Sequence, residues 1–132
     1  MKFIVGGAFQ GKTEFAVKNF GISEAEITDV GKCSVNQFSE FTNVKNYHSF
    51  IRTLMDMKID PIEFTNVICE KKSDMVIIMN EVGCGIIPMD EKERKWREIC
   101  GKCGCIIAEN SEIVVRVICG IGTVIKGDNA CL

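Results

Sequence analysis

Residues 6–13 read Gly-Gly-Ala-Phe-Gln-Gly-Lys-Thr, and together with the segments on either side they constrain the fold more than any other feature of the chain. Residues 2–5 predict a short buried strand, and residues 13–20 predict a helix. A Gly-x4-Gly-Lys-Thr motif between a strand and a helix is typical of a P-loop, whose backbone N–H groups converge on a phosphate at the helix N-terminus. The alternative is a glycine-rich turn that happens to precede a lysine.

The P-loop motif gives each of its residues an expected role. We expect the nucleotide to contact the whole loop, namely Gly6, Gly7, Ala8, Phe9, Gln10, Gly11, Lys12 and Thr13. Lys12 is expected to reach the β- and γ-phosphates and to be catalytic, because it would neutralise charge on the transferring group. The Thr13 hydroxyl is expected to bind Mg²⁺. The expected cofactors are therefore Mg²⁺ and ATP or GTP as phosphoryl donor.

Length and charge limit the classes of protein to which the chain can belong. Its 132 residues suit one domain, which we expect to be a single P-loop nucleotide-binding domain over residues 1–132. The net charge of −2 gives no basic field for nucleic acid or for a membrane surface. No apolar run is long enough for a membrane span, and residues 1–6 do not resemble a signal peptide. These features predict a cytoplasmic protein.

Strands and helices are expected to alternate along the chain. Further strands are predicted at residues 25–30, 74–80, 113–119 and 123–126, and further helices at 46–58, 60–72 and 90–110. Residues 34–44 are interpreted as a loop or a short helix. The alternation predicts an α/β fold of the P-loop NTPase (RecA-like) class, a three-layer sandwich with a mostly parallel sheet. The short glycine turn between the last two strands favours a C-terminal antiparallel hairpin.

Polar residues follow several of the predicted strands, at the edge where ligands bind in open parallel sheets. Asp29 is expected to bind Mg²⁺ through water, although it could instead cap its strand end. Glu81 follows the most apolar strand and is expected to be catalytic, accepting a proton from an attacking hydroxyl or orienting that hydroxyl. Its alternative role is a loop carboxylate bound to the backbone amides of Val82 and Gly83. The P-loop, Asp29, Asn80-Glu81 and the turn at Gly120 are thus predicted to form one site.

The chain contains 8 cysteines, and a nucleotide loop without a leader sequence favours a reducing compartment with free thiols. Cys100, Cys103 and Cys105 form a cluster that could bind a metal or act in redox chemistry. Because the predicted helix does not place all three on one face, small buried side chains are the preferred interpretation. The apolar, cysteine-rich half of this helix is also a candidate contact between subunits.

Four strings of sequence together resemble one family. They are residues 6–13, residues 80–88 (Asn-Glu-Val-Gly-Cys-Gly-Ile-Ile-Pro), residues 93–101 and residues 112–126. In this order they resemble the adenosylcobinamide kinase / adenosylcobinamide-phosphate guanylyltransferase family. The second string is far more specific than the P-loop, which many NTPases share.

This resemblance implies a function in late cobalamin biosynthesis. The family phosphorylates the aminopropanol hydroxyl of adenosylcobinamide and then attaches GMP to the phosphate, and it forms trimers. It also supports the role of Glu81 and makes Asn80, Gly83, Gly85 and Arg97 candidates on the substrate side. Arg94 and Arg97 share a helical face where either could bind phosphate, the alternative being a charged surface. Trp96 could stack on a ring, but a core or interface role is preferred.

The chain departs from the family between its first helix and Asp29, where it is shorter. In the family this segment carries the histidine that holds GMP covalently. The one histidine here, His48, lies in a different predicted helix and is interpreted as a solvated or partly buried side chain. We therefore expect a kinase whose guanylyltransferase half-reaction lacks its histidine. A catalytically reduced nucleotide-binding regulatory or accessory module of the same family remains the alternative.

Overall fold

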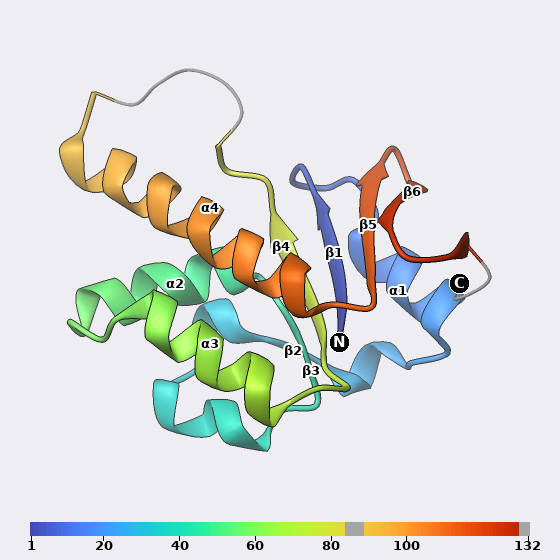
Figure 1. The fold of residues 1–132 in the computed structure, drawn as a ribbon, viewed down its shortest axis with the longest axis horizontal. Helices are drawn as coiled ribbons and strands as arrows, with labels where there is room; N and C mark the ends of the chain where they lie inside the picture. The colour runs from blue at the N-terminus through green and yellow to red at the C-terminus, as the bar shows by residue number, and fades with distance from the viewer. Residues whose placement is uncertain (84–88, 130–132) are drawn as a thin grey trace.

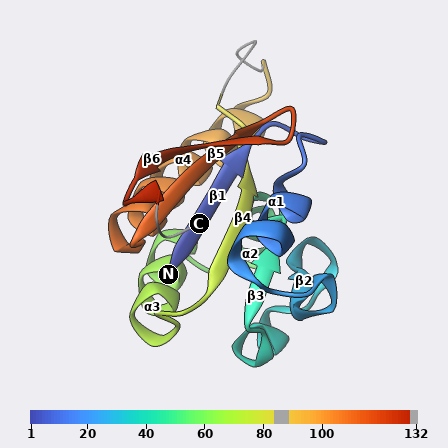
Figure 2. The same ribbon diagram turned by 90° about the vertical axis from the view of Figure 1, so that its right-hand side faces the viewer.

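The computed structural model describes residues 1–83 and 89–129 as a six-stranded sheet between two layers of helices (Figures 1 and 2). The strand order is β2-β3-β4-β1-β5-β6. The strands are β1 (Lys2–Gly6), β2 (Ile27–Asp29), β3 (Asn43–Lys45), β4 (Val76–Asn80), β5 (Ile113–Ile118) and β6 (Ile121–Lys126). Only the β5–β6 pair is antiparallel. The predicted α/β fold of the P-loop NTPase class and its C-terminal hairpin are confirmed.

In the described residues, four α-helices cover the sheet. Helix α1 (Lys12–Phe20) lies on one face, and α2 (Tyr47–Asp56), α3 (Pro61–Lys71) and α4 (Glu91–Asn110) lie on the other (Figure 1). Short 3₁₀ helices span Glu24–Glu26, Val30–Lys32 and Val35–Glu40. Among the described residues, no helix is both long enough and apolar enough to cross a membrane.

Side chains of the central strands are buried on both faces, which explains their continuous apolar runs. Phe3, Ile77 and Val114 pack towards α2, α3 and α4 in the larger core cluster. Ile4 and Ile78 belong to the second cluster, which lies under α1. β1 therefore lies at the centre of the sheet, between β4 and β5, and its carboxyl end leads directly into residues 7–11.

The predicted helix ends agree with the caps in the structure. Asp60 and Asp90 each accept a hydrogen bond from the backbone N–H two residues later, at the starts of α3 and α4. Gly21 ends α1 with φ 65°, the left-handed conformation that glycine adopts without strain. α2 begins one residue later and ends two residues earlier than predicted.

Several sequence-based predictions need correction. The strand predicted at 74–80 begins two residues later, at Val76. The strand predicted at 25–30 is shorter, because residues 24–26 form a 3₁₀ turn held by a Ser23–Glu26 capping box. The segment 34–44, interpreted as a loop or short helix, contains a 3₁₀ helix but ends in strand β3, which was missed. The last turn lies at Cys119–Gly120, so β6 begins two residues before the predicted strand.

Candidate functional site

The loop between β1 and α1 has the shape of a phosphate-binding loop. Gly11 precedes the helix with φ 87°, a conformation that strongly favours glycine. Phe9 also has a positive φ of 59°, and its side chain is fully exposed at the loop tip. The first N–H groups of an α-helix have no intrahelical partners, and at this position they could donate to an anion.

The β5–β6 turn braces this loop. The backbone N–H of Gly120 donates to the carbonyl of Gln10 at 2.7 Å, and the N–H of Cys119 donates to the Gln10 side chain at 2.6 Å. A Cβ built on Gly11 would lie 3.2 Å from the Cα of Gly120. The glycines in both segments thus allow the turn and the loop to pack closely, and the predicted convergence of the loop with the Gly120 turn is present.

Lys12 is the first residue of α1, and its side chain folds back over the loop. It is 8% exposed, and its Nζ donates to the carbonyl of Gly7 at 2.6 Å. Burial lowers the pKa of Lys12, and the nearby carboxylates of Glu81 and Glu14 oppose this shift. A bound phosphate would add the negative charge that stabilises the ammonium form.

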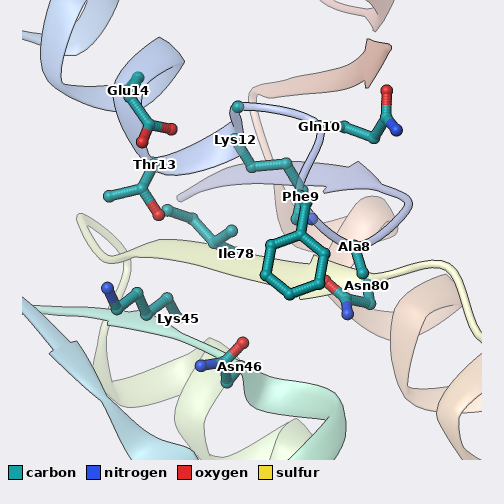
Figure 3. Close-up of a pocket in the computed structure, with 11 residues that line it drawn as sticks. Ala8, Phe9, Gln10, Lys12, Thr13, Glu14, Lys45, Asn46, Ile78 and Asn80 are labelled. Carbon is teal, nitrogen blue, oxygen red and sulfur yellow. The ribbon is translucent and has the colours of Figure 1, made fainter. Parts of the chain in front are cut away.

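A pocket of about 370 Å³ opens beside the loop (Figure 3). Its walls come from the P-loop, from the first turn of α1, and from the carboxyl ends of β3 and β4; the lining residues are Ala8, Phe9, Gln10, Gly11, Lys12, Thr13, Glu14, Lys45, Asn46, Ile78 and Asn80. Within the part of the chain that the structure describes, the side chains of Thr13, Lys45, Asn46 and Asn80 have no hydrogen-bond or ion-pair partner. Polar groups that converge on a pocket with their hydrogen-bonding capacity unused are suited to binding a polar ligand.

The side chains that line the pocket and could bind Mg²⁺ are not all the ones expected from the sequence. Thr13, expected to bind Mg²⁺, lines the pocket, and so does Glu14, the next residue of α1. One hydroxyl and one carboxylate fit a Mg²⁺ ion that takes its other oxygens from phosphates and water. Asp29 does not line the pocket; its Oδ1 accepts the N–H of Gly31 at 2.9 Å, which is the capping role named as its alternative.

Glu81 follows β4 and lies beside the P-loop. Its backbone N–H donates to the carbonyl of Gly6 at 3.0 Å. Its carboxylate receives two hydrogen bonds from Arg116 on β5, Nε to Oε1 at 2.7 Å and Nη2 to Oε2 at 3.0 Å. This bidentate pair fixes the orientation of the carboxylate.

An apolar groove of about 330 Å³ lies on the other side of Asn80 and Glu81. Its lining includes Phe3, Val5, Met79, Val82, Cys100 and Gly104, together with Asn80 and Glu81 themselves. The polar pocket and the apolar groove therefore share Asn80, and Glu81 is the carboxylate at the groove. A ligand in each would place a phosphate chain and an apolar molecule next to each other.

His48 is buried, in contrast to the solvated or partly buried side chain expected. It is 8% exposed, its Nδ1 accepts the N–H of Asn80 at 3.1 Å, and its carbonyl accepts Trp96 Nε1 at 2.9 Å. Burial, with a smaller effect of the Lys12 charge, lowers the pKa of His48 from 6.5 to about 4, while Asp29 opposes the shift. The neutral ring thus holds the end of β4, where the two cavities meet.

The buried histidine predicts a pH-dependent stability. The unfolded chain binds a proton near pH 6.5 and the folded protein only near pH 4, so the free energy of unfolding should fall as pH is lowered through this window. His48→Asn keeps a side-chain oxygen to accept the Asn80 N–H but cannot titrate. Urea unfolding at several pH values should therefore show that the free energy of unfolding falls less steeply with decreasing pH in His48→Asn than in the wild type. An equal pH dependence in the two proteins would contradict this role of His48.

Other predicted site residues lie away from the pocket or outside the described residues. Gly85 falls in residues 84–88, which are not described, and Gly83 lines the apolar groove. Arg97 is half-buried on α4 and does not line the polar pocket, while exposed Arg94 donates from Nη1 to the Met89 carbonyl at 2.7 Å. Trp96 packs against the Arg52 guanidinium at 4.1 Å, in agreement with the structural role preferred for it.

The cysteine cluster is divided between the core and the surface. Cys100 and Cys103 are buried, whereas Cys105 is exposed. Burial raises the pKa of Cys100 to about 12 and also raises that of Cys103, so both thiols stay protonated and inert. In residues 1–83 and 89–129, no three His, Cys, Asp or Glu side chains are grouped to hold a metal. The buried side of this half of α4 contacts the chain's own α3, so it is not free for a subunit contact.

Sequence reasoning missed several residues at the site. Glu14, Lys45, Asn46 and Ile78 line the pocket, and Arg116 holds Glu81. Ile78 and Arg116 belong to predicted strands, but only the strand order shows that they lie at the site. Lys45 and Asn46 could not be assigned to the site, because the strand that Lys45 ends was interpreted as a loop.

The fold and the loop geometry define an α/β protein of the P-loop NTPase fold class. The family described as cobinamide kinase / cobinamide phosphate guanyltransferase (CobU) matches residues 42–125, and the chain belongs to this family. It is similar to the bifunctional adenosylcobalamin biosynthesis protein CobU of Salmonella typhimurium, with 34% identity over 68 residues. That alignment covers 51% of this chain and 38% of the relative, so the chain matches well under half of that protein's length. A role connected with cobalamin biosynthesis and nucleotide-related transfer follows from the family.

Proposed function

We propose that this protein is a nucleoside-triphosphate-dependent kinase that phosphorylates the aminopropanol hydroxyl of adenosylcobinamide. The observation that carries the proposal is the meeting of two unlike cavities at Asn80. The polar pocket suits a nucleotide triphosphate, and the apolar groove suits part of an acceptor. Because a groove of about 330 Å³ cannot enclose a corrin ring, we propose that it takes the side arm and the adjoining ring edge.

The proposed reaction is an in-line phosphoryl transfer. The acceptor hydroxyl oxygen forms a bond to the γ-phosphorus, the bond to the β–γ bridging oxygen breaks, and the nucleoside diphosphate leaves. Lys12 stabilises the charge on the transferring group. Mg²⁺, when bound with the nucleotide, neutralises charge on the β- and γ-phosphates, and Thr13 and Glu14 are the residues that would hold it.

Glu81 is proposed to accept the hydroxyl proton or to orient the hydroxyl. The two hydrogen bonds from Arg116 hold its carboxylate in place beside the groove, which supports this role. Glu81→Gln is nearly isosteric but cannot act as a base. We expect it to lower kcat by roughly 100-fold, within the range for loss of general-base catalysis, with little change in nucleotide affinity.

Steady-state kinetics and isothermal titration calorimetry with a non-hydrolysable triphosphate would separate these two effects. Asp56→Asn, which changes a carboxylate in the exposed Lys92–Asp56 pair on the α2 side, is the matched control and should retain wild-type kcat. An unchanged kcat in Glu81→Gln would remove Glu81 from the mechanism.

We propose that this chain performs the kinase step without guanylyl transfer through a histidine. His48 is the single histidine in the sequence, it is 8% exposed, and its Nδ1 is occupied by the Asn80 N–H. Incubation with radiolabelled GTP followed by denaturing electrophoresis should leave the protein unlabelled.

A nucleotide-binding regulatory or accessory module is the second candidate. It is favoured by the Arg116 contact, which occupies both oxygens of the proposed base. The test is incubation of the protein with Mg²⁺, ATP or GTP, and adenosylcobinamide, followed by mass spectrometry. Adenosylcobinamide phosphate supports the kinase, and nucleotide binding without this product supports the module.

A further inference from the structure

Two lysines from different elements line the polar pocket. Figure 3 shows Lys12 and Thr13 on one side and Lys45 and Asn46 on the other. Lys12 belongs to the P-loop motif, whereas Lys45 is the last residue of β3, far from the loop in sequence. The position of Lys45 follows from the strand order, because β3 pairs with β4 and β4 pairs with β1.

The backbone around Lys45 is firmly anchored. Val44, the residue before it, is fully buried, and Asn46 turns the chain into α2 with φ 63°. Tyr47, the first residue of α2, is also fully buried, and its hydroxyl hydrogen-bonds Thr65 at 2.8 Å. Because the residues on both sides are held in the core, Lys45 projects from a rigid part of the pocket wall.

Within residues 1–83 and 89–129, no carboxylate forms an ion pair with the Lys45 side chain. Asp29 is its register partner across the β2–β3 pair, yet the Asp29 carboxylate accepts the N–H of Gly31. Among the described residues, the side-chain ammonium of Lys45 has no hydrogen-bond acceptor. Glu14 is the one carboxylate among the described residues that line the pocket, against two lysines and the positive end of α1. The pocket therefore has positive charge beyond what Lys12 provides.

We propose that Lys45 is a second phosphate-binding cation, which contacts the terminal phosphoryl group of a bound nucleoside triphosphate from the side opposite Lys12. This inference rests on the proposed function in one respect: transfer requires the terminal group to face the acceptor groove at Asn80. Asn80 and Lys45 both belong to the wall formed by β4 and β3. A diphosphate lacks the group that Lys45 contacts, so Lys45 selects triphosphate over diphosphate.

The test compares triphosphate and diphosphate binding in matched variants. Lys45→Met keeps most of the side-chain length and removes the charge, and Lys95→Ala removes an exposed charge from α4 as the control. The probes are the imidotriphosphates of adenosine and guanosine, with ADP and GDP, titrated calorimetrically with Mg²⁺. We expect Lys45→Met to weaken imidotriphosphate binding about tenfold or more, as for loss of a charged hydrogen bond, and diphosphate binding much less. Lys95→Ala should bind both classes like the wild type.

Equal weakening of triphosphate and diphosphate, or no weakening, would overturn the inference, as would a wild type that binds no triphosphate. Thermal unfolding without nucleotide would show whether Lys45→Met is folded, and Lys45→Arg should restore most of the discrimination. The outcome is separable from that of the kinase proposal. If Lys45→Met weakens triphosphate binding selectively but the wild type does not phosphorylate cobinamide, the Lys45 site stands and the proposed acceptor is refuted. If the wild type phosphorylates cobinamide but Lys45→Met weakens triphosphate and diphosphate binding equally, the acceptor stands and the Lys45 site is refuted.

Discussion

Replacing Lys12 with alanine is expected to lower kcat/KM for phosphoryl transfer by at least about 100-fold, because the variant loses a positive charge aimed at the transferring group. The folded structure should survive the change. Lys12 is almost fully buried, its pKa is lowered by burial, and its side chain donates one hydrogen bond to Gly7. Loss of that hydrogen bond changes the free energy of unfolding by only about 1 kcal/mol.

The measurement is product formation under steady-state conditions, together with urea unfolding of the same preparations. Lys95→Ala serves again as the control for a change of one charge. Wild-type kcat/KM in Lys12→Ala would contradict the assignment of the loop as the phosphate site. A large loss of stability in Lys12→Ala would instead mean that this lysine has a structural role.

Replacing Gly6 with alanine is expected to destabilise the protein by about 2 kcal/mol or more. A Cβ at this position would lie 2.4 Å from the Val117 carbonyl oxygen, which belongs to the backbone of β5. Backbone cannot move aside as a flexible side chain can, so β1 or β5 must shift, and overpacking of this kind costs about 1–3 kcal/mol. Because Gly6 is where β1 ends and the P-loop begins, the shift should also weaken nucleotide binding.

Gly101→Ala is the matched control for this substitution. Gly101 lies on the exposed side of α4, and a Cβ there would meet nothing within 4 Å. Alanine in place of a helical glycine should raise the free energy of unfolding by up to about 1 kcal/mol. Urea unfolding of both variants should thus give shifts of opposite sign. A Gly6→Ala variant as stable as the wild type would contradict the close packing of the P-loop start against β5.

The sequence alone was sufficient for the fold class because its strongest patterns are local. The apolar runs in β4 and β5 favour buried strands, and Asp60 and Asp90 mark helix starts through hydrogen bonds made within two residues. β3 was missed because Asn-Val-Lys has little intrinsic preference for a strand. It is held by pairing with β2 and β4 and by the Asn43 side chain, which accepts the N–H of Val76 at 3.0 Å.

The candidate site was predicted only in part, because strand order is not local. Asp29 was correctly placed at the end of a strand, but β2 is the outermost strand on its side of the sheet, separated from β1 by β3 and β4. Because of this strand order, Lys45 lines the pocket, whereas Asp29 lies outside its lining and caps the turn that follows β2. The P-loop roles and the magnesium role of Asp29 stay predictions until nucleotide binding is measured.

Transfer of a labelled γ-phosphoryl group to adenosylcobinamide would show whether this protein is a kinase. The protein would be incubated with Mg²⁺, adenosylcobinamide, and ATP or GTP carrying ¹⁸O on the γ-phosphorus, and the corrinoid would be analysed by mass spectrometry. We expect the wild type to form adenosylcobinamide phosphate that carries the label, and Lys12→Ala to form none. Unmodified adenosylcobinamide, in a protein shown by calorimetry to bind the nucleotide, would contradict the kinase proposal.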